Sequence, residues 1–387
     1  MNNKRILTII VLAQFCCTSL WFASNAVINP IIETFSLQNN ALNLLTSAIQ
    51  FGFICGTLVF AAFNVADSFS PSKVFFISAL LASLLNLGIL LPQNSLLSLM
   101  GLRFGVGILL AGIYPVGMKI ASDYFKKGLG KSLSFLVGAL VIGTAFPHLL
   151  SHTIEASIWK QAIIYTSILS GIGGLLVLIF VPNGPYRMAN SKIDLSLFIS
   201  IFKSKTFRKT AFGYFGHMWE LYTFWAFVPI ILNYYNTHQN TTLNIPFWAF
   251  VIIASGSIAC VIGGYISERI TVKKTTIIAL SLSGLCCLFS PLFLSTSSIV
   301  IFILFLIFWG MVVIMDSPLL STMAAKHAHP ETRGTALTIV NCIGYSITIL
   351  SIEFMAYLTQ IINLNYIFII LFLGPLFGVI SLFKTKA

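Results

Sequence analysis

The chain contains 387 residues, of which 57% are hydrophobic and only 8% are charged. A soluble domain carries about 25% charged residues, so this composition excludes an ordinary water-soluble protein. Apolar runs near the roughly 20 residues that cross a bilayer recur from end to end, and they predict an all-α integral membrane protein.

Twelve transmembrane helices are predicted from these runs. In chain order they cover residues 6–32, 42–65, 74–92, 96–118, 132–151, 161–182, 208–233, 246–267, 275–294, 298–320, 334–358 and 363–383. Lys4 and Arg5 precede the first run as in a signal peptide. The run is longer than the apolar region of a signal peptide, so we expect an uncleaved first helix.

The positive charges give the orientation of these helices. All of the 22 Lys and Arg residues except Arg103 and Lys160 fall near the termini or in alternate loops. Those loops are 67–73, 119–131, 187–209, 268–274 and 326–333. Because positive loops stay in the cytoplasm, we expect both termini there. The formal charge of +12 is therefore a topology signal, and nucleic acid is not an expected partner.

The longest polar interval divides the twelve helices into two sets of six. The predicted domains are an N-terminal six-helix bundle (1–182), a cytoplasmic linker (183–207) and a C-terminal six-helix bundle (208–387). Within the linker, the segment 193–202, "IDLSLFISIF", fits either a short amphipathic helix on the membrane surface or a plain connection.

The two halves repeat each other at an offset of about 200 residues. Matched positions are Trp21 with Trp225, Asp67 with Glu268, Pro115 with Pro318, and Gly130 with Gly334. Because each half holds an even number of spans, both repeats have the same orientation, which makes them parallel repeats.

The loop at 264–274, "GYISERITVKK", resembles the signature of the major facilitator superfamily, G-x-x-x-D-R/K-x-G-R-R/K. Gly264, Glu268, Arg269, Lys273 and Lys274 carry the resemblance. The first-half copy, "FNVADSFSPSK", keeps only Asp67 and Lys73. Arg103 and Gly107 match the R-x-x-x-G pattern of the family's fourth helix, whereas "GALVIGTAFPHL" lacks the Gly-Pro centre of the antiporter motif.

The resemblance covers essentially the whole chain and implies the fold and activity of that family. The expected fold is twelve helices in two six-helix repeats, and the expected activity is secondary transport by alternating access. The stretches "YPVGMK" and "GYFGHMWELY" are similar to a bacterial branch of unassigned substrate, which implies the inner membrane. By the same resemblance, Asp67, Glu268 and Arg269 gate the cytoplasmic face.

Four charged residues stand out inside predicted spans, away from the span ends at the cytoplasmic loops: Arg103, Glu220, Asp316 and Glu353. A charge at the bilayer centre costs at least about 2.5–3.5 kcal/mol, so such residues usually face a cavity or a partner. In the resembled fold, helices 1, 4, 7 and 10 line the cavity, and Arg103, Glu220 and Asp316 fall on three of them. Glu353, near the outer end of its span, is expected at the wet interface.

His217 and Glu220 are three residues apart, so they share one helix face with Gly213 and Phe224. Glu220 lies about 18 Å into its helix, near the midplane. We therefore interpret Glu220 as the proton-coupling carboxylate, with His217 adjusting its proton affinity or relaying its proton. The alternative is a permanent pair of Glu220 with Arg103 or His217 that only holds helices together. Asp316, beside Pro318, is a gate or coupling residue, or else a cap.

Arg103 presents a fork of donors that suits a substrate carboxylate, although it would equally serve as the partner of Glu220 or Glu353. Aromatic and amide side chains on the same helices complete the predicted substrate site: Trp21, Asn25, Tyr114, Trp219 and Tyr222. Each aromatic residue, taken singly, fits packing or interface anchoring better than ligand binding, but the set on helices 1, 4 and 7 indicates a substrate with apolar or delocalised parts.

No cofactor and no metal is expected. His148 and His152 have the spacing of a two-histidine metal site, with Glu155 as a third ligand, but interfacial histidines are the preferred reading. The seven cysteines fall within spans and match no disulfide or zinc pattern. No P-loop motif occurs, so ATP is not the direct energy source.

The sequence thus predicts a secondary transporter, acting as a monomer and not as an enzyme, that moves a small, carboxylate-bearing anion together with protons. The main alternative is a proton-driven exporter of lipophilic or cationic compounds, favoured by Glu220, Asp316 and the aromatic residues. An intramembrane enzyme, or a receptor or channel without turnover, are the non-transport alternatives.

Overall fold

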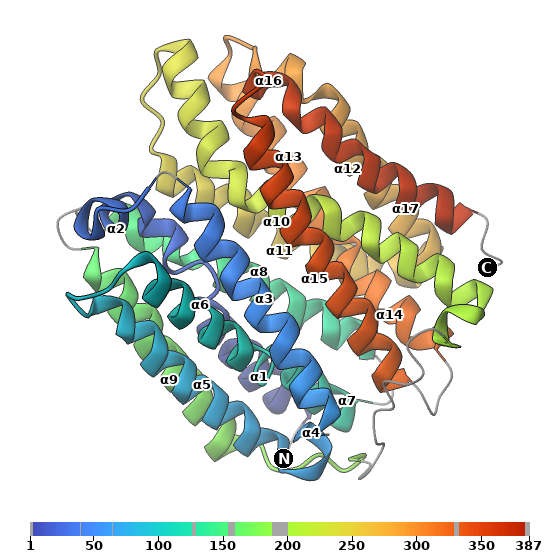
Figure 1. The fold of residues 1–387 in the computed structure, drawn as a ribbon. Helices are drawn as coiled ribbons and strands as arrows, with labels where there is room; N and C mark the ends of the chain where they lie inside the picture. The colour runs from blue at the N-terminus through green and yellow to red at the C-terminus, as the bar shows by residue number, and fades with distance from the viewer. Residues whose placement is uncertain are drawn as a thin grey trace. The chain divides into compact units, whose positions relative to one another are not determined.

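The computed structural model describes residues 3–38, 40–63, 65–125, 129–153, 159–187, 200–328 and 333–383, and in these ranges it is helical without strands (Figure 1). The predicted all-α class is confirmed. The segment 193–202 lies largely outside the described residues, as do Glu155 and the side chain of Asp67.

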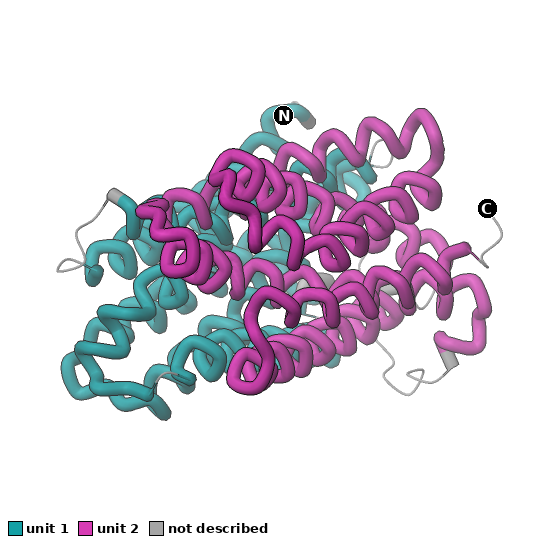
Figure 2. The backbone as a smooth tube through the Cα atoms, turned by 90° about the horizontal axis from the view of Figure 1, so that it is seen from above, with its two compact units in different colours: residues 1–194 teal, residues 195–387 magenta. Residues whose placement is uncertain are grey.

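The chain divides into two compact units, Met1–Asp194 and Leu195–Ala387 (Figure 2). Unit 1 contains α1 (Asn3–Thr18), η1 (Asn25–Val27), α2 (Ile28–Phe35), α3 (Ala41–Ala62), α4 (Val65–Ser68), α5 (Pro71–Leu87), η2 (Gly88–Leu90), α6 (Leu96–Leu110), α7 (Tyr114–Tyr124), α8 (Leu129–Thr153) and α9 (Lys160–Phe180).

Unit 2 contains η5 (Ser200–Lys203), α10 (Lys205–Gln239), α11 (Ile245–Ile270), α12 (Val272–Leu294), α13 (Ile299–Met315), α14 (Ser317–His327), α15 (Arg333–Leu358), α16 (Leu364–Ile367), η7 (Phe368–Phe372) and α17 (Leu373–Phe383).

Ten of the twelve predicted spans correspond, within the described residues, to helices long and apolar enough to cross a membrane. The other two are the first and the seventh. The first is short because α1 ends at Thr18. The seventh, α10, has 35 residues and would reach about 52 Å at 1.5 Å per residue, so it is long enough. Polar residues such as His217 and Glu220 lower its mean hydropathy.

Two predicted spans that were taken as continuous are each broken in the structure. The fourth is divided between α6 and α7, and the tenth between α13 and α14. In both, a proline, Pro115 or Pro318, stands within the first two positions of the new helix, where its missing N–H costs no hydrogen bond. The same break at equivalent places supports the internal repeat.

The first span, predicted to run unbroken over 6–32, is also interrupted. After α1 the chain passes through 19–24 before η1 and α2. Neither proline nor glycine stands in this segment. Instead, the hydroxyls of Thr18 and Ser19 donate to the carbonyls of Gln14 (2.8 Å) and Cys16 (2.7 Å), and such local bonds compete with continuation of the helix.

Glycine residues let neighbouring helices approach closely inside each unit. In unit 1, α3 and α6 lie side by side, and a Cβ atom at Gly52 would stand 2.0 Å from the carbonyl oxygen of Phe104. In unit 2, a Cβ atom at Gly216 of α10 would stand 2.2 Å from the carbonyl oxygen of Gly374 in α17. These contacts fix α10, which carries His217 and Glu220.

Candidate functional site

Arg103 of α6 is fully buried and binds the interrupted part of the first helix. Its Nη1 donates to the carbonyl oxygen of Leu20 at 2.9 Å, and its Nη2 donates to that of Trp21. Carbonyls at a helix end lack intrahelical donors, and the guanidinium supplies them. Among the described residues, no carboxylate pairs with Arg103, and its Nε has no hydrogen-bond partner. Glu220 and Glu353 lie in unit 2, so the alternative pairing of Arg103 with either of them stays a prediction.

Trp21 and Asn25 lie in the same interrupted region and contact α3. The ring of Trp21 packs against that of Phe53 with a centroid distance of 5.0 Å, and Asn25 Nδ2 donates to Thr46 Oγ1 at 2.7 Å. Both residues are buried. Their predicted role in binding a substrate stays a prediction, because these contacts are internal to unit 1.

Glu220 is buried where α10 meets α12 and α13. Its Oε1 accepts hydrogen bonds from Ser283 Oγ at 2.6 Å, Trp309 Nε1 at 2.7 Å and Cys287 Sγ at 3.2 Å. The alternative of a direct Glu220–His217 pair is not among these described contacts. None of the three donors was predicted from the sequence. Ser283 and Cys287 are one helical turn apart, and this spacing indicates that they share a helix face.

His217 has a different partner, Asp316, at the junction of α13 and α14. Its Nδ1 lies 2.9 Å from Asp316 Oδ1, and both side chains are buried. The contact has the distance of an ion pair without the angles of a hydrogen bond. As the spacing predicted, His217, Glu220 and Phe224 share one face: all three contact the α13–α14 helix, Phe224 through Trp309 at 4.5 Å.

Trp219 and Tyr222 lie on other faces of α10. Trp219 Nε1 donates to the carbonyl oxygen of Ile370 at 3.4 Å, and the hydroxyl of Tyr222 lies 2.8 Å from that of Tyr345 in α15. Tyr114 is half-buried at the start of α7. Within unit 2, the described hydrogen bonds of Trp219 and Tyr222 go to other residues than Glu220, and the contact of the predicted aromatic residues with a substrate remains a prediction.

Glu268 and Arg269 are exposed in the last turn of α11, and their role in a gate remains a prediction. Glu353 is exposed on α15. His148 is buried and His152 is exposed. Within the described ranges, no group of three or more His, Cys, Asp or Glu side chains could hold a metal ion.

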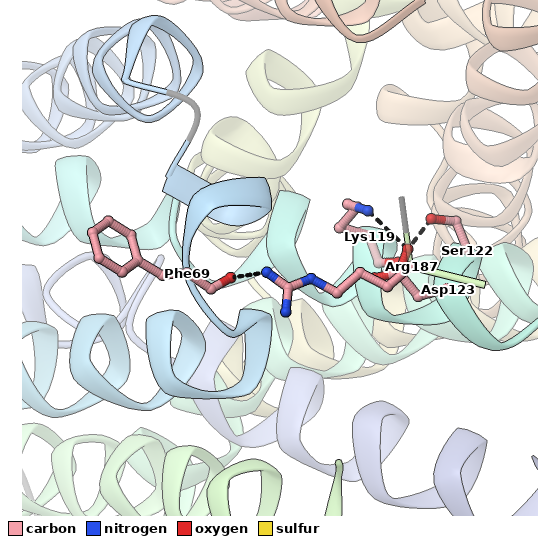
Figure 3. A network of polar contacts seen from close by, with 5 residues as sticks. All are labelled: Phe69, Lys119, Ser122, Asp123 and Arg187. Carbon is pink, nitrogen blue, oxygen red and sulfur yellow. Dashed lines mark hydrogen bonds and ion pairs between the residues drawn. The ribbon is translucent and has the colours of Figure 1, made fainter. Parts of the chain in front are cut away.

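A polar network that the sequence analysis missed lies near the end of α7 (Figure 3). Lys119 Nζ lies 2.8 Å from Asp123 Oδ1, and the backbone N–H of Tyr186 donates to the carbonyl oxygen of Asp123 at 3.0 Å. Arg187 Nη2 donates to the carbonyl oxygen of Phe69 at 2.9 Å. The segment after α9 is thereby attached to two other parts of unit 1.

Comparisons with known proteins agree with this architecture. The proton:xylose symporter XylE, bound to 6-bromo-6-deoxy-D-glucose, superposes with a TM-score of 0.78 at 14% identity, over 99% of this chain and 96% of that chain. The human organic anion transporter MFSD10 (TETRAN) gives 0.76 at 12% identity, over 99% of this chain and 100% of that chain. A comparison with curated proteins gives no match.

At such identities these likenesses show the fold alone. The family itself is shown by the sequence, which matches the model of the Major Facilitator Superfamily over residues 10–352. The resemblance seen in the loop motifs is thereby confirmed, and the chain belongs to the major facilitator superfamily of multi-pass membrane transporters.

Proposed function

We propose that this secondary transporter moves a small, carboxylate-bearing anion by alternating access and that transport is coupled to protons through Glu220. The proposal places the chain as a monomer in a bacterial inner membrane with both termini in the cytoplasm. Glu268, Arg269 and Asp67 gate the cytoplasmic side, and Asp316 with His217 assists coupling.

The observation that carries this proposal is the environment of Glu220. Burial within a membrane protein disfavours an ionised carboxyl group, whereas three hydrogen bonds to one of its oxygens favour the ionised form. A carboxyl group under these opposed influences is suited to gain and lose a proton during a transport cycle.

Arg103 supports the choice of an anionic solute. It is a buried cation whose described hydrogen bonds go to backbone carbonyls and to no carboxylate. Its positive charge is therefore available to attract an anion toward unit 1 at long range. We infer that Trp21, Asn25, Tyr114, Trp219 and Tyr222 contribute to the substrate site.

A second candidate, export of lipophilic cations, is favoured by unit 2. There, Glu220 and Asp316 are both buried, and the rings of Phe224 and Trp309 lie 4.5 Å apart beside Glu220. Carboxylates next to aromatic faces suit an organic cation.

The test uses the purified full chain reconstituted in proteoliposomes that contain a pH-sensitive dye. Citrate, lactate, xylose and tetraphenylphosphonium are added one at a time. We expect a carboxylate to move protons in the wild type and not in Glu220→Gln, with carboxylate counterflow retained in the variant. Proton movement by Glu220→Gln equal to that of the wild type would overturn the coupling role, and movement driven only by tetraphenylphosphonium would overturn the anion assignment.

A further inference from the structure

One oxygen of Glu220 receives every described hydrogen bond to this side chain. Ser283 Oγ, Trp309 Nε1 and Cys287 Sγ all donate to Oε1, at 2.6, 2.7 and 3.2 Å. Among the described residues, no hydrogen bond to Oε2 occurs. The two oxygens of the carboxyl group are therefore in different surroundings, and one of them remains able to carry a proton.

The three donors come from two helices and are themselves held in place. Ser283 and Cys287 stand one turn apart on the same face of α12. Trp309 of α13 is fully buried, with the rings of Phe224 and Phe305 at centroid distances of 4.5 and 5.6 Å. A donor whose rotamer is fixed by packing holds its acceptor at a defined position without further ordering cost.

We propose that Ser283, Trp309 and Cys287 are positioning residues that hold Glu220 through Oε1 and set the pH range in which it exchanges its proton. The proton binds at Oε2: on uptake an O–H bond of a hydronium ion breaks as the Oε2–H bond forms, and on release the Oε2–H bond breaks as a water molecule accepts the proton. The proposal rests on the proposed function, in which Glu220 is the proton carrier.

Few titratable groups surround this carboxyl group. Asp316 acts on it from the α13–α14 junction, and Cys286 and Cys287 lie near it on α12. His217 is one turn away on α10 and faces Asp316. On the other helices packed against α10, three titratable side chains have described contacts that lead elsewhere: Cys260 of α11 to the carbonyl of Ile314, His327 of α14 to Thr210, and Tyr345 of α15 to Tyr222. Cys342 and Glu353 also lie on α15, with no described hydrogen bond to Glu220, and α17 contains no titratable side chain. Apart from Cys287 itself, none of these titratable groups donates a described hydrogen bond to Glu220 Oε1 in place of Ser283, Trp309 or Cys287.

The test needs no substrate. Infrared difference spectra of the purified full chain in lipid vesicles are recorded across a pH series, and Glu220→Gln identifies the carboxyl band of Glu220. Removing a donor destabilises the ionised form, so in Ser283→Ala and Trp309→Phe we expect the midpoint of that band to move to higher pH by about one unit, a tenfold change in proton affinity. Cys287→Ala should move it less, because a thiol is a weak donor.

Matched controls separate positioning from general damage to the fold. Ser290→Ala removes another buried hydroxyl of α12, which donates to the carbonyl of Cys287. Trp225→Phe changes a second fully buried tryptophan, which lies on α10 and not on α13. Both should keep the wild-type midpoint. Ser283→Thr retains a hydroxyl and should restore it. Unchanged midpoints in Ser283→Ala and Trp309→Phe would overturn the positioning role and leave Glu220 as the proton carrier. A pH series without any band that Glu220→Gln removes would overturn both proposals.

Discussion

Replacing Arg103 tests whether its buried guanidinium stabilises the protein by hydrogen bonds to the backbone carbonyls after α1 or only by its positive charge. In Arg103→Met, the carbonyls of Leu20 and Trp21 lose two hydrogen bonds from a charged donor, each worth about 1.5–3 kcal/mol. The variant also removes a buried charge that costs at least about 2.5–3.5 kcal/mol. The difference lies between a gain of about 0.5 kcal/mol and a loss of about 3.5 kcal/mol in the free energy of unfolding.

Arg103→Lys separates the two roles because it keeps the charge and its cost but cannot reach both carbonyls with a planar fork. Losing one bond without relief of the charge should cost about 1.5–3 kcal/mol, so Lys should be no better tolerated than Met. Equilibrium unfolding in mixed detergent micelles, followed by tryptophan fluorescence, measures both variants. Wild-type stability in Arg103→Lys together with a large loss in Arg103→Met would show that charge, and not carbonyl binding, is the stabilising property.

Three further experiments test the packing and the ion pairs. Gly216→Ala should prevent stable expression or cost about 1–3 kcal/mol or more, because its Cβ atom meets backbone at 2.2 Å, whereas Gly171→Ala, with nothing within 4 Å, should be neutral in the same thermal assay. His217→Gln and Asp316→Asn should each cost about 1–3 kcal/mol, and the double variant less than their sum, in a double-mutant unfolding cycle. Lys119→Ala, which breaks a partly exposed i,i+4 pair, should change the unfolding free energy by at most about 1 kcal/mol.

The sequence was sufficient to predict the helices and the family but not the partners of the buried charges. Apolar runs are local signals, and they located the spans. The partners are distant in the chain: Glu220 meets Ser283 and Trp309 across 63 and 89 residues, and Arg103 meets Leu20 across 83. Serine, cysteine and tryptophan are ordinary packing residues in membrane helices, so no local pattern indicates which of them binds a carboxylate.

The interruption of the first helix was missed for a related reason. Residues 19–24 contain neither proline nor glycine, and the hydroxyls of Thr18 and Ser19 are compatible with a continuous helix. The guanidinium of Arg103, brought there by the packing of α6 in unit 1, donates to the carbonyls of Leu20 and Trp21 in this interruption, and its position in the fold is not a local signal.

The buried charges differ in what compensates them, and this difference singles out Glu220. Arg103 binds carbonyls just beyond the C-terminal end of α1, and Asp316 stands at the N-terminal end of α14; a cation at a C-terminus and an anion at an N-terminus are both stabilised by the helix dipole. Glu220 lies in the middle of α10, which runs unbroken from Lys205 to Gln239, so no helix end offsets its charge. Its ionised form depends on side-chain donors from α12 and α13. A movement of those two helices against α10 would therefore change its proton affinity directly, whereas Arg103 and Asp316 would keep their helix-end compensation.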